Sequence, residues 1–83
     1  MEPFKNITVQ YFAMFRETAG KDREEITTSA GTARACYMEL AERYGFNIGA
    51  GHIRVAINDE FGRLDQQLCS GDTLVFIPPV SGG

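Results

Sequence analysis

The sequence has no tryptophan and only two cysteines among its 83 residues. Cys36 and Cys69 form neither a CxxC pair nor a metal-ligand spacing, which argues against a zinc site and against a thioredoxin-type redox motif. A [2Fe–2S] ferredoxin is excluded, because its cluster needs more cysteine ligands than the chain has. Residues 1–15 lack the pattern of a secretory signal, so we expect free thiols and a cytoplasmic protein.

Strong charge of one sign and long apolar runs are also missing. The formal net charge is −3, and the basic residues are spread along the chain, which gives no electrostatic footprint for nucleic acid. No stretch approaches the roughly 20 apolar residues of a membrane span. The chain has neither a GxxxxGK[ST] phosphate loop nor a GxGxxG fingerprint. We therefore expect no membrane contact, no bound cofactor or metal, and no enzyme activity of the chain by itself.

Hydrophobic periodicity predicts a single domain over residues 1–83. Residues 32–44 place apolar side chains at helical spacing, between Thr32 as N-cap and Gly45 as C-terminal stop. Short apolar or alternating runs predict strands, the first two forming an antiparallel hairpin. The order of elements is typical of an α+β, ubiquitin-like β-grasp fold, with a mixed sheet of four or five strands packed on one main helix. The predicted strands are residues 6–12, 24–28, 53–57, 61–64 and 73–77.

The last residues, 78–83, are predicted to be a flexible C-terminal tail. Pro78 and Pro79 end the last strand because proline has no N–H for a sheet ladder. The tail closes with Gly82 and Gly83, which lack Cβ atoms and are therefore thin. Six extended residues reach about 20 Å. Such a tail suits insertion of a terminal carboxyl group into a narrow channel of another protein.

The C-terminal sequence GDTLVFIPPVSGG, residues 71–83, resembles the end of the molybdopterin synthase small subunit family. YFA at 11–13, FRE at 15–17 and AIN at 56–58 are similar to that family's first strand, the loop after it, and its middle strand and turn. A terminal Gly-Gly alone is shared by all ubiquitin-like carriers, including the thiamine sulfur carrier. The preceding Pro-Pro-Val-Ser favours the molybdopterin branch.

The resemblance implies a sulfur-donating subunit of a two-subunit transferase. An adenylyltransferase of the ubiquitin-activating type would use ATP to adenylate the carboxyl group of Gly83, beside Gly82, and a thiocarboxylate would follow. The thiocarboxylate would donate sulfur to cyclic pyranopterin monophosphate in molybdenum cofactor biosynthesis. The large synthase subunit would hold that pterin, with both kinds of subunit in a heterotetramer.

A partner surface is expected around the root of the tail. In the last strand, Leu74 and Phe76 are expected to face the helix, which turns Val75 and Ile77 outward. With other outward aromatic residues these would form an exposed apolar patch. The matching positions of the family face the partner. The predicted partner-binding residues are Phe12, Arg16, Phe61, Val75, Ile77, Pro78, Pro79, Val80 and Ser81.

Two other functions remain open from the residues. The chain would then be a carrier for another route, such as thiamine thiazole synthesis, tRNA thiolation or ubiquitin-like conjugation to lysine, or a β-grasp binding module without covalent chemistry. Cys36 lies on the apolar stripe of the helix and is expected in the core, and Cys69 precedes a turn. His52 is expected to be a solvated loop residue.

Overall fold

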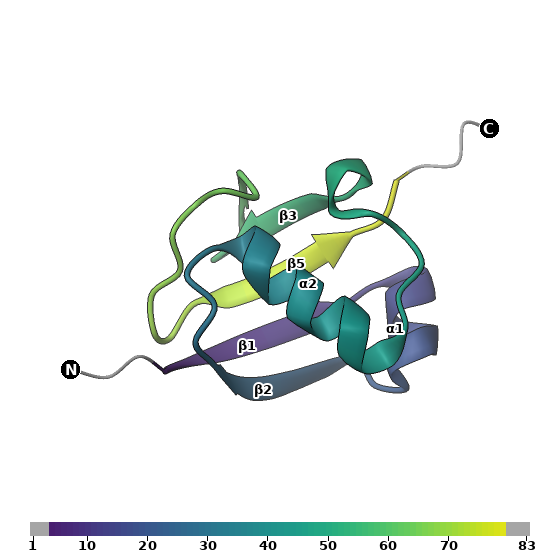
Figure 1. Cartoon of the computed structure of the whole chain (residues 1–83), viewed down its shortest axis with the longest axis horizontal. Coiled ribbons are helices and arrows are strands. Elements are labelled where there is room, and N and C mark those ends of the chain that lie inside the picture. The colour runs from purple at the N-terminus through teal and green to yellow at the C-terminus, as the bar shows by residue number, and fades with distance from the viewer. Residues whose placement is uncertain (1–3, 80–83) are drawn as a thin grey trace.

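The computed structural model describes residues 4–79 (Figure 1). Gly82 and Gly83, with Val80 and Ser81 before them, lie outside the described residues. In chain order the elements are β1 (Lys5–Tyr11), α1 (Ala13–Ala19), β2 (Arg23–Thr28), α2 (Ala33–Tyr44), η1 (Ala50–His52), β3 (Arg54–Ile57), β4 (Glu60–Gly62) and β5 (Thr73–Ile77).

The five strands form one mixed sheet in the order β2-β1-β5-β3-β4. β1 and β5 run parallel, whereas the pairs β1–β2, β3–β5 and β3–β4 are antiparallel. Figure 1 shows α2 lying across one face of this sheet. The arrangement is the α+β, ubiquitin-like β-grasp predicted from the sequence. None of the helices in residues 4–79 is long and apolar enough to cross a membrane.

The core forms where the buried side chains of β1 pack against the apolar side of α2. Ile7, Val9 and Tyr11 are buried on the face of β1 that α2 covers. In α2, Thr32 accepts a hydrogen bond from the Ala35 N–H at 3.1 Å, as an N-cap does. Gly45 ends the helix with a φ of 79°. The predicted helix and both of its ends are therefore confirmed.

A second helix, α1, differs from the sequence prediction. We expected a strand through Phe12 and then a loop, but the strand ends at Tyr11 and Phe12 is the residue that precedes α1. Its carbonyl accepts a hydrogen bond from the Phe15 N–H at 2.9 Å. Phe15 is 1% exposed and anchors the helix in the core, and Gly20, with a φ of 79°, ends it. Helix-favouring residues followed by a glycine are a signal for a helix. The strand pattern of the preceding residues obscured this signal in the sequence.

The smaller elements agree with the sequence apart from their ends. β3 starts one residue later than predicted, and the short strand after it covers Glu60–Gly62 instead of 61–64. Asn58 and Asp59 form the turn between them, with φ angles of 53° and 72°. Two consecutive positive φ angles match the twist of the two strands that the turn joins. The predicted loop at 49–51 overlaps the 3₁₀ turn η1 (Ala50–His52).

The chain has no tryptophan, and phenylalanine and tyrosine rings fill the centre of the core. The rings of Phe15 and Phe46 lie 4.9 Å apart, and those of Tyr37 and Phe76 lie 5.2 Å apart edge to face. Leu74 and Phe76 of β5 are both 0% exposed. The prediction that these two residues face the helix is confirmed.

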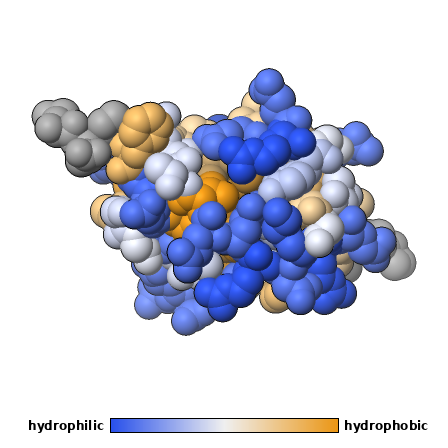
Figure 2. All heavy atoms as spheres, turned by 90° about the horizontal axis from the view of Figure 1, so that it is seen from below, coloured by the Kyte–Doolittle hydropathy of each residue, from blue (hydrophilic) through white to orange (hydrophobic). Residues whose placement is uncertain are grey.

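The outer edge of the sheet at β2 is protected by charge. Arg23, Glu24 and Glu25 open this strand, and Figure 2 shows mostly hydrophilic side chains on this side of the molecule, around a small apolar area. Charged side chains on an edge strand discourage pairing with another chain. The β2 edge is therefore unsuited to pairing with a strand of a partner.

Glu24 joins β2 to the end of α2 through its half-buried carboxylate. The hydroxyl groups of Tyr11 and Tyr44 donate to Oε2 at 2.5 and 2.6 Å, and Lys21 Nζ lies 3.5 Å from Oε1. Burial by itself would raise the pKa of Glu24, but the hydrogen bonds from the two tyrosines and the charge of Lys21 outweigh it and lower the pKa. The ionised carboxylate therefore stabilises the fold.

We predict that Glu24→Gln lowers the free energy of unfolding by about 1–2 kcal/mol at neutral pH, because charge-assisted hydrogen bonds are lost. A carboxylate whose folded pKa is depressed stabilises the fold above its unfolded pKa of about 4.3 and loses this effect as the pH falls through the folded pKa. The difference between the two proteins should therefore shrink in acid. Urea unfolding from pH 7 to pH 3 measures it.

The matched control is Glu25→Gln, one residue further on. Glu25 is exposed and points to the opposite face of the sheet. It should change stability by less than about 0.5 kcal/mol at every pH. Equal losses for the two variants would contradict the role assigned to the Glu24 network.

Candidate functional site at the root of the tail

The last strand, β5, fixes where the tail begins. It lies between β1 and β3 in the middle of the sheet, with Tyr11 beside Phe76 and Arg54 beside Ile77. Pro78, half-buried, and Pro79, exposed, follow directly. The tail root is therefore held by hydrogen-bonded strands on both sides.

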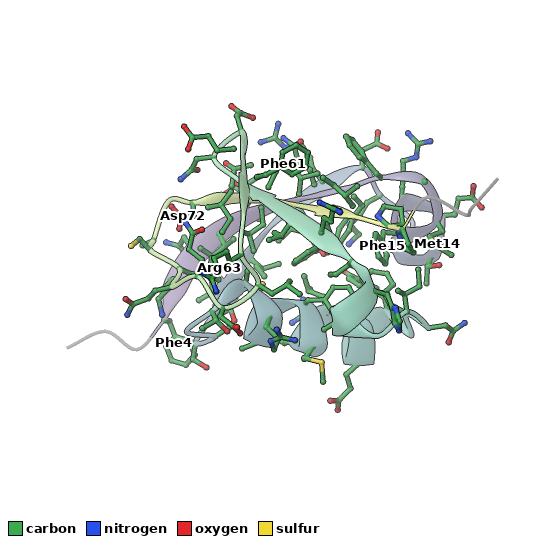
Figure 3. The ribbon with its side chains drawn as sticks, turned by 90° about the horizontal axis from the view of Figure 1, so that it is seen from above. Phe4, Met14, Phe15, Phe61, Arg63 and Asp72 are labelled. Atoms are coloured by element: carbon green, nitrogen blue, oxygen red, sulfur yellow. The ribbon has the colours of Figure 1, made fainter. Side chains whose placement is uncertain are left out.

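The sheet face turned away from α2, which we call the outer face, carries a cross-strand apolar row. Val75 lies between Gln10 and Ala56, and Ala56 is paired with Phe61. The Phe61 ring is 77% exposed, and Figure 3 shows it on the side of the sheet opposite α2. Such an exposed aromatic ring beside other apolar groups is typical of a docking surface.

Val75 differs in exposure from the prediction. It does point to the outer face, but its neighbours on both strands cover it and leave it 9% exposed. A β-branched residue in a central strand is shielded by its cross-strand neighbours even on the solvent side. Val75 therefore supports the outer face from beneath, while Phe61 forms its exposed part.

Ile77 and Phe12 lie at the tail end of the sheet. Ile77 is half-buried, and Phe12 is 51% exposed at the start of α1 instead of in the strand. Met14, 47% exposed on α1, adds an apolar side chain that the sequence analysis did not select. The predicted apolar patch is thus divided between the outer face and the neighbouring start of α1.

Arg16 stands on the last turn of α1, whereas the sequence suggested a loop. Its Nε lies 3.7 Å from Asp22 Oδ1, and both side chains are largely exposed. With Phe12 and Gln10 it lines a shallow depression of about 300 Å³. An exposed ion pair contributes little to stability, so the Arg16 side chain is available for a contact with a partner.

A second depression, of about 510 Å³, lies directly beside the tail root. Its walls are the segment from η1 into β3, with His52 and Arg54, and the end of β5, with Ile77 and Pro78. The sequence analysis did not select Arg54. Its place opposite Ile77 depends on the register of two strands that are distant in sequence.

The two thiols differ in their surroundings. Cys36 is buried in the core, and burial raises its pKa to about 12. Cys69 is exposed. His52 is exposed as well, as expected, and residues 4–79 hold no group of three or more side chains arranged to bind a metal ion. The described residues therefore offer a docking surface and an origin for the tail between two hydrogen-bonded strands.

Comparison with known proteins places the chain in a family. The ThiS family matches residues 9–83. The molybdopterin synthase sulfur carrier subunit of Escherichia coli (strain K12) is 32% identical over 80 residues, which cover 93% of this chain and 99% of that protein. Among solved structures, a putative molybdopterin converting factor subunit 1 from Pyrococcus furiosus is 32% identical with a TM-score of 0.76, over 92% of this chain and 99% of that one.

A complex is also among the similar structures. In the complex of subunits 1 and 2 of the molybdopterin-converting factor from Helicobacter pylori 26695, the matching chain is 26% identical with a TM-score of 0.60. The match covers 94% of this chain and 99% of that one.

We predict that iodoacetamide modifies one thiol of the folded protein and two of the unfolded protein. Cys69 should react at pH 8, whereas Cys36 should be spared because it is buried and its raised pKa keeps it protonated. Intact-mass measurement counts the adducts, and Cys69→Ser should leave none in the folded protein. Two adducts on the folded wild-type protein would contradict the core position of Cys36.

Proposed function

The chain belongs to the ThiS family, and from this membership we propose that it is the sulfur-carrying subunit of a molybdopterin synthase. The observation that carries the proposal is the identity of 32% to the Escherichia coli sulfur carrier subunit over nearly the whole of both chains. The fold supports it, because β5 leads from the centre of a rigid sheet directly into the PPVSGG end. A cytoplasmic location remains a prediction.

The proposed chemistry takes place at the carboxyl group of Gly83. A carboxylate oxygen attacks the α-phosphorus of ATP on an adenylyltransferase, and pyrophosphate leaves. A sulfur donor then replaces AMP at the carbonyl carbon, which gives the thiocarboxylate. On the large subunit the sulfur atom is transferred to a carbon of cyclic pyranopterin monophosphate, and hydrolysis returns the carboxylate. Two such rounds supply the two sulfur atoms of the dithiolene.

The described residues contribute by binding and positioning. Phe61 on the outer face, with Ile77 and Phe12 near the tail root, offers apolar area to a partner. Pro78 and Pro79 restrict the backbone where the tail starts, which lowers the entropy lost when it enters an active site. The large subunit is the proposed partner for this surface, as the complex of the Helicobacter pylori relative suggests.

We predict that removing Gly83, or adding one residue after it, abolishes sulfur transfer and leaves the melting temperature unchanged within about 2 °C. The expectation follows from the position of Gly83 in the sequence, because the buried core described here is made by residues that precede Pro78. Pterin conversion and thermal melting are measured on the same preparations. Conversion by the shortened protein would contradict the carrier proposal.

The mass of the sulfur-loaded protein distinguishes a sulfur carrier from the alternative functions. With ATP, adenylyltransferase and a sulfur source, a thiocarboxylate adds about 16 Da, and a persulfide on cysteine adds about 32 Da. The double variant Cys36→Ala, Cys69→Ser should still gain about 16 Da. Conjugates to lysine would favour a protein modifier, and no mass change at all would favour a non-covalent binding module.

We predict that Phe61→Lys weakens binding of the large subunit by about 2 kcal/mol or more, because an exposed aromatic anchor is lost. The melting temperature should fall by less than about 3 °C, since the ring is 77% exposed in the free chain. Phe76→Lys is the contrasting variant, and it should prevent folding because Phe76 is 0% exposed. Isothermal titration calorimetry gives the affinities. Wild-type affinity in Phe61→Lys would remove the outer face from the interface.

A further inference from the structure

Charge is unevenly distributed along the strand pair β3–β5, in a chain whose net charge is −3. At the end where β5 stops and the tail begins, β3 starts with Arg54, preceded by His52. At the other end, Asp59 lies in the turn after β3, Glu60 opens β4, and Asp72 precedes β5. Figure 3 shows Asp72 at the end of the molecule opposite α1. The tail therefore leaves from the basic end of the strand pair β3–β5.

Arg54 has no acidic partner within residues 4–79. The ion pairs of this part of the chain are Arg16–Asp22, Lys21–Glu24, Arg34–Asp65 and Arg43–Glu39. Arg54 is exposed and is paired with Ile77 of the neighbouring strand. The depression that it shares with His52, Ile77 and Pro78, which we call the Arg54 groove, has no acidic residue in its described lining.

We propose that the Arg54 groove receives an acidic segment of the large synthase subunit when the tail enters that subunit. This inference rests on the proposed function and names the chemistry of the partner surface. A cation without a counter-ion beside apolar side chains fits a carboxylate flanked by apolar groups. The groove is also continuous with the tail root, so the protein that accepts the tail must pass over it.

An acidic occupant of the Arg54 groove affects the rate at which the chain associates with the large subunit. The Arg54 cation next to the tail attracts an acidic partner surface before contact and raises the association rate at low ionic strength. The acidic residues Asp59 and Glu60 disfavour approach by the opposite end. Charge at Arg54 should therefore affect association with the large subunit much more than equal charge placed elsewhere.

The test uses two variants that change the net charge by the same amount. Arg54→Glu reverses the charge in the groove, whereas Arg34→Glu reverses it in the first turn of α2, on the covered side of the sheet. Arg34→Glu also removes the ion pair with Asp65, which is exposed and contributes little to stability. Acid near a helix N-terminus is tolerated, so the control should fold normally. Affinity for the large subunit from the same organism is measured by calorimetry at about 50 mM and about 500 mM salt.

We expect Arg54→Glu to weaken binding at least about tenfold at low salt and Arg34→Glu to change it by less than about twofold. The difference should narrow at high salt. Equal effects of the two variants, or wild-type affinity in Arg54→Glu, would overturn the proposal. So would slower thiocarboxylate formation in Arg54→Glu with normal binding of the large subunit, because the occupant would then be the adenylyltransferase.

Failure of the proposed function gives a different result. In that case wild-type protein would gain no mass of about 16 Da with ATP, adenylyltransferase and a sulfur source. The proposal for the Arg54 groove is tested by binding to the large subunit and not by thiocarboxylate formation. Melting curves of both variants, expected within about 3 °C of wild type, show that the comparison concerns folded proteins.

Discussion

The parallel pairing of β1 with β5 is the constraint on which the rest of the structure depends. It joins the first and last strands of the chain at the centre of the sheet, with Val9 beside Leu74 and Tyr11 beside Phe76. A parallel pair cannot be closed by a tight turn, so everything between the two strands forms the crossover. That crossover contains α2, which covers one face and buries Leu74 and Phe76. The pairing thus fixes both the core and the point where the tail leaves it.

The sequence predicted the fold well because its signals are local and strong. Alternation in residues 6–12 and the capped apolar stripe of 32–44 each correspond to an observed element. The strand 73–77 was predicted with its correct ends. What failed was α1, a short helix whose residues continue an aromatic strand without a break. Its local signal, helix-favouring residues before Gly20, was masked by the strand pattern, and its packing through Phe15 against Phe46 is a tertiary contact that the sequence pattern does not contain.

The candidate site was predicted less completely than the fold. Strand alternation correctly placed Val75 on the outer face, but its exposure depends on which strands flank it. Arg54 was not predicted as a site residue for the same reason, because its position beside Ile77 follows only from the β3–β5 register. Exposure and neighbourhood across a sheet are properties of strand order. A sequence shows which way a side chain alternates, but strand order decides what covers it.

The layered structure also limits how partners can use the tail. α2 covers the inner face of the sheet, and charged residues line the edge at β2. The apolar outer face and the Arg54 groove are therefore the surfaces left for a partner, and the groove is lined by Pro78. From Pro78 the sequence continues to Gly82 and Gly83. Under the proposed function, the adenylyltransferase and the large subunit need the same end of the same tail. One carrier cannot serve both at once, so it must dissociate from one before it engages the other. Each complex must therefore dissociate within the cycle, and exposed apolar contacts combined with a salt-sensitive charge contact are compatible with such exchange.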